Sequence, residues 1–209
     1  MAFLAPLNPS AHSETIIIPI TLRSWVQSNG YYPGANATSN YVALVGSHNN
    51  FFAWNLSGRS AATISSATLY LNSSNVSGSG TYSIYDVSSS TASLLNPGNT
   101  LTSVAAFSDL GGGNSYGSTS YSSASNGQYS VINFNTAGIA ALQAAWGVGF
   151  FDIGGAAVGT GMIFGGSSSV PTSQTYLSVD IVPEPSALSL LVVGLGGVIA
   201  LRRVRRKAD

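Results

Sequence analysis

The sequence predicts an all-β body, a two-sheet sandwich with one short helix, followed by a single C-terminal transmembrane helix. Between residues 15 and 181, short apolar stretches recur and are bounded by Gly, Ser and Asn, the pattern of short strands joined by turns. Several of these stretches alternate apolar and polar residues, as strands with one buried face do. An uncharged apolar stretch followed by five basic residues ends the chain, and this order predicts the transmembrane helix.

Nine strands are expected in the body, each flanked by turn residues. In chain order they are Thr15–Leu22, Tyr41–Val45, Phe51–Leu56, Ala67–Leu71, Thr81–Val87, Leu101–Phe107, Gln128–Phe134, Gly147–Ile153 and Tyr176–Ile181. The alternation is clearest in the fourth strand, where Leu69 and Leu71 would face the core and Tyr70 the opposite side. Repeated short strands of this kind favour two packed sheets.

The stretches between the strands are expected to contain one helix and one long loop. Asn135 or Thr136 would cap a helix at residues 137–145. The apolar side chains that would share one face of this helix are Ile139, Leu142 and Trp146. Residues 108–127 are rich in Gly and Ser and are expected to form a surface loop.

The net charge of zero conceals two segments of opposite charge. Residues 1–185 contain two basic and six acidic residues, whereas residues 202–209 contain five basic residues and one acidic residue. The acidic body argues against a nucleic-acid partner, because binding phosphates requires a basic face. The chain has no cysteine, which excludes disulfides and thiolate metal sites.

Residues 187–201 form an uncharged apolar stretch of the kind that crosses membranes. As a helix they would reach about 22 Å, short of a hydrocarbon core of about 30 Å. Ser186, Val204 and snorkelling arginines bring the length near the lower limit for a span. A buried core helix would also fit this length. The basic run that follows at once favours the membrane, because a core helix has no reason to be apolar on every face.

Five basic residues follow the apolar stretch and set its expected orientation. They are Arg202, Arg203, Arg205, Arg206 and Lys207. Basic segments stay on the cytoplasmic side of a membrane, so residues 1–185 are expected to lie outside.

This topology requires export, and residues 1–14 are expected to be the remnant of a signal peptide whose start lies upstream. The segment has a brief apolar stretch and ends in small residues around Ala11-His12-Ser13. It lacks the basic beginning and the full apolar length of a complete signal peptide. An ordinary flexible N-terminus is the alternative interpretation.

Val182-Pro183-Glu184-Pro185 stands directly before the apolar stretch, and its two prolines favour an extended, accessible backbone. Together with the small residues Ser186 and Ala187, the Leu/Gly/Val-rich helix and the arginine cluster, this segment resembles the PEP-CTERM sorting signal of Gram-negative bacteria. The resemblance covers residues 182–209. It implies recognition by an exosortase, a membrane-embedded cysteine protease or transpeptidase. That enzyme would release the body from the inner membrane or transfer it to an acceptor, leaving it at the cell surface or in the extracellular matrix. A plain linker is the alternative interpretation of the prolines.

The body itself resembles a second group of proteins more loosely. The stretches "FFAWNLSGRSAATISSATLYLN", "NFNTAGIAALQAAWGVGFFDIGG" and "PTSQTYLSVDI" occur in this order. They resemble the DNRLRE-like and carbohydrate-binding-type jelly-roll domains of bacterial surface proteins. The resemblance implies a jelly-roll-like sandwich over residues 15–181 and no particular activity.

The body offers little catalytic chemistry. His48 lies in a "GSHNN" turn, and neither it nor His12 has the spacing of a metal site, so no metal or cofactor is expected. Asp86, Asp109 and Asp152 could pair as the acid and base of a glycan hydrolase. Their positions after or within strands favour turn-capping roles instead. We therefore expect that the protein is not an enzyme.

Aromatic residues are the remaining candidates for binding. Trp54 and Trp146 fall in apolar patterns and are expected to fill the core. Tyr31 and Tyr32 lie in a turn, where exposed rings could stack on the sugars of an exopolysaccharide. The leading interpretation is an exported surface or matrix protein that contacts membrane lipid at least transiently. A carbohydrate-binding module is the alternative, and a hydrolase is less favoured.

Overall fold

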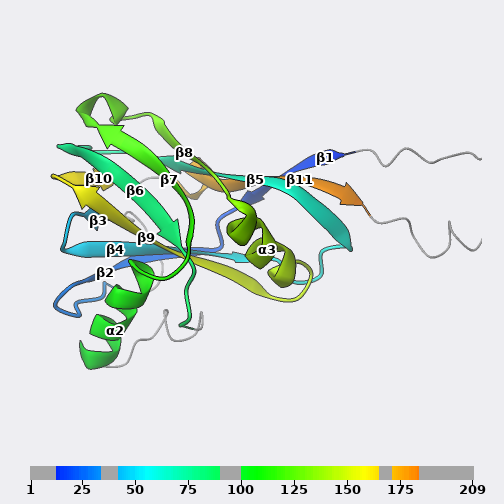
Figure 1. Cartoon of the computed structure of the whole chain (residues 1–209), viewed down its shortest axis with the longest axis horizontal. Coiled ribbons are helices and arrows are strands. Elements are labelled where there is room, and N and C mark those ends of the chain that lie inside the picture. The colour runs from blue at the N-terminus through cyan, green and yellow to red at the C-terminus, as the bar shows by residue number, and fades with distance from the viewer. Residues whose placement is uncertain (1–12, 34–41, 90–99, 165–170, 184–209) are drawn as a thin grey trace, which may run out of the picture.

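Two antiparallel sheets face each other in the protein, and two short helices lie beside them (Figure 1). The computed structural model describes residues 13–33, 42–89, 100–164 and 171–183. The predicted all-β, two-sheet architecture is confirmed over this part of the chain. The expectation of one helix is wrong, because the same part contains two.

The smaller sheet has four strands in the order β1-β11-β5-β8. The bounds of these strands are Glu14–Pro19 for β1, Thr175–Pro183 for β11, Ala62–Asn72 for β5 and Tyr129–Asn133 for β8. β11, the last of the described strands, thus lies between β1 and β5. It pairs with β5 over nine residues and with β1 over six.

The larger sheet has seven strands, with the path β10-β3-β4-β9-β6-β7 and with β2 paired to β4. Their bounds are Leu22–Gln27 for β2, Ala43–Leu44 for β3, His48–Asn55 for β4, Ser79–Tyr85 for β6, Ser115–Ser122 for β7, Phe150–Gly159 for β9 and Met162–Phe164 for β10. β4 and β9 form the middle of this sheet, with six residue pairs between them.

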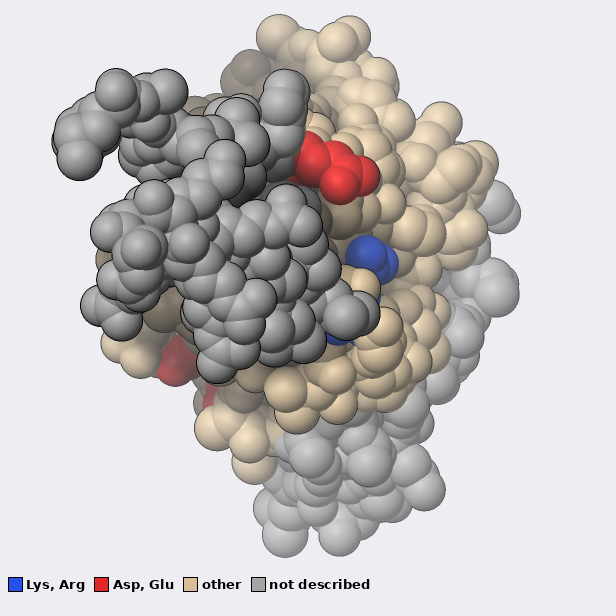
Figure 2. Space-filling model, turned by 90° about the vertical axis from the view of Figure 1, so that its right-hand side faces the viewer, with Lys and Arg blue, Asp and Glu red and all other residues tan. Residues whose placement is uncertain are grey.

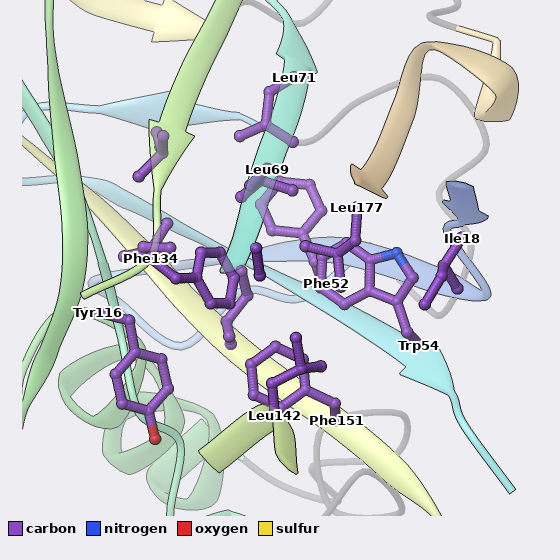
Figure 3. Close-up of a cluster of buried hydrophobic side chains, with 14 of the residues drawn as sticks. Ile18, Phe52, Trp54, Leu69, Leu71, Tyr116, Phe134, Leu142, Phe151 and Leu177 are labelled. Carbon is purple, nitrogen blue, oxygen red and sulfur yellow. The ribbon is translucent and has the colours of Figure 1, made fainter. Parts of the chain in front are cut away.

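The core lies between the two sheets, where side chains from both point toward one another (Figure 3). Leu69 and Leu177 come from the smaller sheet, and Phe52, Trp54 and Phe151 come from the larger one. The alternation predicted for β5 is confirmed: Leu69 is fully buried and Tyr70, on the opposite face, is not. Trp54 and Trp146 are buried, also as predicted.

Strand β4 is buried on both of its faces. Phe52 and Trp54 point to the sandwich core, whereas Phe51 faces the other way and packs with Val26 and Leu110. A strand covered on both sides has no need to alternate, which explains the continuous "NNFFAW" sequence here.

Helix α2, Thr100–Leu110, covers the face of β4 that points away from the sandwich core. The strand predicted at Leu101–Phe107 is therefore wrong, because these residues belong to this helix. Its Ala106 and Leu110, four residues apart, are buried against β2 and β4. Short apolar stretches fit a strand or a helix equally well, and here a one-sided packing surface selects the helix.

The surface loop predicted at residues 108–127 is also wrong in part, because it contains strand β7. β7 pairs with β6 through seven residue pairs and buries Tyr116 and Tyr121. The backbone of β7 pairs with the edge of β6. The Ser-rich sequence of β7 does not by itself predict this pairing.

Helix α3, Thr136–Ala145, confirms the predicted helix. The Asn135 side chain caps it by accepting a hydrogen bond from the Gly138 amide at 3.0 Å. Leu142 and Trp146 are buried and Ile139 packs against the core, so the predicted face is the packed one.

None of the helices in the described ranges has the length and apolarity that crossing a bilayer requires. The stretch predicted to do so, residues 187–201, lies outside these ranges.

Replacing Leu69 with Ala should lower the free energy of unfolding by about 2–5 kcal/mol, because it leaves a cavity between the two sheets. Val131, on the neighbouring strand β8, points outward, and its replacement with Ala should cost less than about 1 kcal/mol. Denaturant unfolding of both variants measures the difference. Equal losses would contradict the position of Leu69 in the core.

Candidate functional site: an aromatic face and a polar strand edge

Three tyrosines from three strands meet on the outer face of the four-stranded sheet. Tyr70 on β5 and Tyr176 on β11 are direct register partners, and their rings stack with centroids 4.8 Å apart. Tyr129 on β8 stands edge-on to both rings, at 6.2 Å from Tyr70 and 6.0 Å from Tyr176. Burial, and then the neighbouring Tyr129 and Tyr70, raise the pKa of Tyr176. The three rings therefore form one cluster, which we call the tyrosine face.

Sequence reasoning did not single out these tyrosines. The alternation predicts that Tyr70 points away from the core, but the register that places Tyr176 beside it joins residues more than 100 positions apart. Outward-facing tyrosines in several predicted strands were the available signal. The order of the strands in the sheet was the missing information.

A second aromatic group lies where β2 ends and β4 begins. Gln27 is the register partner of His48, and the Trp25 ring lies 4.9 Å from the His48 ring and 5.7 Å from the Tyr31 ring. Tyr31 is 55% exposed. Tyr32 is half-buried and packs against the cluster that includes Val26, and burial raises its pKa although a hydrogen bond with Ser24 opposes this. The two candidate glycan contacts therefore have different surroundings, and only Tyr31 presents an open ring.

His48 is held through both ring nitrogens. Its Nδ1 lies 2.5 Å from the Ser47 hydroxyl oxygen, and its Nε2 lies 3.0 Å from the Gln27 amide nitrogen. Where that amide donates to Nε2, Nδ1 carries the proton and donates to Ser47. In this tautomer His48 cannot accept the serine proton, which is the step that a nucleophilic serine requires.

The three candidate carboxylates have different partners. Asp86 accepts hydrogen bonds from the Asn114 backbone and side-chain amides at 2.7 and 3.0 Å. Asp109 accepts from the Ser88 and Ser89 backbone amides and from the Ser88 hydroxyl. Burial raises the pKa of Asp109, but the hydrogen bonds from these serines outweigh it and leave the pKa below its ordinary value. Both residues fix the loops around them.

Asp152 lies on β9, beside a hollow of about 460 Å³ that Tyr116, Val148 and Phe150 also line. Within the described ranges, no three His, Asp or Glu side chains come together as a metal site would require.

The end of the sandwich where β1 begins and β11 ends carries the first two residues of the predicted sorting motif. Val182 and Pro183 belong to β11 and pair with Thr63 and Ala62. Beside them is a hollow of about 450 Å³ that Glu14, Trp146 and Arg59 help to line, with the Arg59 guanidinium 5.2 Å from the centre of the Trp146 ring. Figure 2 shows this end of the molecule, where a few acidic and basic residues lie among uncharged ones.

The remaining predicted functional residues lie outside the described ranges. They are Glu184, Pro185, Arg202, Arg203, Arg205, Arg206 and Lys207.

Comparison of the sequence with models of known protein families finds no match. Comparison with curated proteins finds no match either. The inferences that follow rest on the residues and geometry of this chain.

His48 should make the stability of the protein depend on pH. Burial lowers its pKa below the ordinary value of 6.5, so the unfolded chain binds this proton more tightly than the folded chain does. Stability should therefore fall as the pH is lowered from about 7 to about 5. In His48→Gln, the melting temperature should change less over this interval.

Asp109 provides the control for this experiment. Its pKa is lowered from an ordinary value of 3.8, so its contribution is lost only at more acidic pH. Asp109→Asn should keep the wild-type slope between pH 7 and 5. A His48→Gln slope identical to that of the wild type would contradict the assignment to His48.

Proposed function

We propose that the protein is an exported surface or extracellular-matrix protein of a Gram-negative bacterium, sorted through its C-terminal segment by an exosortase. One observation carries the proposal: the Val-Pro-Glu-Pro motif, an apolar stretch and a basic cluster occur together and in this order at residues 182–209. The protein stays anchored in the inner membrane, in contact with lipid, until the motif is processed. It needs no metal or cofactor and is not an enzyme.

The fold of the body supports this proposal in one respect. Glu14 on β1 pairs with Ile181 on β11, so the beginning of β1 and the end of β11 lie at the same end of the sandwich (Figure 1). The C-terminal segment therefore continues from a rim of the body and not from its middle. A body of this kind can fold completely outside a membrane, with the C-terminal segment following directly after β11.

The finer fold assignment belongs to the same proposal. The body is a jelly-roll-like sandwich that includes Glu14 in β1, and residues 187–201 form one transmembrane helix. The apolar composition of residues 187–201 and the basic residues after them support the helix.

A second candidate function is binding of an exopolysaccharide by the body. The tyrosine face favours it, because clustered, partly exposed aromatic rings are a common means of holding sugars. A glycan hydrolase is less favoured, because Asp86 and Asp109 are engaged in hydrogen bonds to loop amides and hydroxyls.

Intact-mass measurement of the mature protein tests the sorting proposal directly. Processing should remove the apolar and basic residues, so the mass should correspond to a chain that ends near residues 182–186. A mature protein that retains residues 187–209 would contradict the proposal.

Glu184→Gln should slow release of the body while leaving its fold and membrane insertion intact. Glu184 is the only charged residue between Ile181 and Ala200, and a carboxylate beside an apolar span is costly unless a partner receives it. An enzyme that supplies this partner would lose it with the neutral isostere. Pulse-chase labelling in a host with a matching exosortase measures the rate, and a plain linker at this position would give identical rates.

Neutralising the five basic residues at 202–207 should let the C-terminus cross the membrane or lose a single orientation, because these charges set the topology. Replacing only the four arginines with lysine keeps the charge and should keep the orientation. Protease accessibility of a C-terminal tag distinguishes the two. Cytoplasmic protection of the tag in the neutral variant would count against the assigned topology.

A further inference from the structure

The outer face of the four-stranded sheet is open to solvent over most of its width. Outward side chains on β1, β11, β5 and β8 are exposed or half-buried, whereas inward ones such as Leu69 and Leu177 are fully buried. Tyr129 is 42% exposed, and Val131 beside it is 43% exposed. An exposed cluster of aromatic and aliphatic side chains of this kind is typical of a binding surface.

The rings of the tyrosine face provide contact surfaces in two orientations. Tyr70 and Tyr176 are stacked within 13° of parallel, and Tyr129 lies at 78° to Tyr70. The rings rise from neighbouring strands, so the backbone ladder fixes their spacing. Tyrosine supplies a large contact area at a low cost in side-chain entropy, and its hydroxyl can hydrogen-bond at the same time.

The charge of this face selects among polymers. The outward positions of the four strands hold mostly Ser, Thr, Asn and Tyr, and Asp180 is the one charged residue among those described. The Thr15 and Ser66 hydroxyls donate to its two carboxylate oxygens at 2.5 and 2.6 Å, and these hydrogen bonds lower its pKa. With a carboxylate and no cation, the face does not attract nucleic acids or anionic polysaccharides.

Neighbouring hydroxyl and amide groups complete the surface. Thr68 lies two residues before Tyr70 on β5 and on the same face of the sheet. Its hydroxyl donates to the Asn133 side-chain oxygen at 3.0 Å. A row of rings beside a row of neutral hydrogen-bonding groups matches a sugar chain, which presents C–H faces and hydroxyls. The Ser, Thr and Asn side chains around the rings favour a sugar chain over a second copy of this chain, because the cores of protein interfaces are more apolar and Ile17 and Val131 are the only strongly exposed aliphatic residues described on this face.

We infer that the tyrosine face binds a neutral polysaccharide, with Tyr129 and Tyr176 as the main ring contacts. The inference rests on the second function proposed above, and it assigns the ligand class and the residues. It does not depend on processing of the C-terminal segment.

Affinity electrophoresis of the full-length chain tests the inference, in a detergent without a sugar headgroup. The gels contain a neutral glucan, a neutral galactomannan or, for comparison, an alginate. We expect at least one neutral polymer to retard the wild type and alginate to have no effect. Tyr129→Ala should weaken that binding about tenfold, as the loss of an aromatic contact at the centre of an interface does.

Two matched variants separate binding from folding. Tyr129→Phe keeps the ring and should stay within about threefold of the wild type. Val158→Ala shortens an exposed side chain on β9 of the larger sheet and should bind as the wild type does. Thermal unfolding of each variant shows whether the fold is retained.

Each of the following outcomes would overturn the inference: no retardation by any neutral polymer, retardation by alginate alone, unchanged binding in a folded Tyr129→Ala variant, and loss of binding in a folded Val158→Ala variant alone. Concentration-dependent self-association that Tyr129→Ala abolishes would also overturn it and would assign the face to a second copy.

Discussion

The position of β11 between β1 and β5 is the constraint on which the rest of the structure depends. β11 contributes Leu177, Val179 and Ile181 to the core and hydrogen-bonds to a neighbour on each side. Without it the four-stranded sheet would separate into two parts, and the aromatic side chains of β4 and β9 would lose their cover. Its pairing with β5 closes a loop of about 100 residues, which costs entropy before the contacts form. The sheet can therefore be completed only after nearly all of the body is available.

The same strand links the tyrosine face to the C-terminal segment. Tyr176 lies near the start of β11 and Val182 and Pro183 near its end, so one strand carries a ring of the face and the first residues of the proposed motif. The tyrosine face lies on the outside of the sheet, and Val182 and Pro183 lie at its rim. A ligand on the face and an enzyme at the rim would thus approach different parts of the body.

Sequence patterns predicted the parts of the fold that depend on local alternation and local capping. The strand around Leu69 and the helix after Asn135 follow from such patterns, and both are confirmed. The prediction of a strand at Leu101–Phe107 was wrong because its apolar spacing fits a strand and a helix. Only packing against β2 and β4 selects the helix. The prediction of a loop in place of β7 was wrong because a Ser-rich strand is specified by its pairing with β6 and not by its own sequence. The tyrosine face required a register between distant strands, which no local pattern contains.

Hydroxyl and amide groups take the place of charges in this body. The carboxylates of Asp86, Asp109 and Asp180 each accept hydrogen bonds from Asn, Ser or Thr. Such bonds orient loops and strands without a cation, and salt screens them less than it screens exposed ion pairs. A surface built in this way remains hydrophilic while attracting few polyions. The scarcity of charge seen in the sequence is therefore consistent with a protein that works among neutral polymers, because it allows close contact with them and discourages adhesion to charged ones.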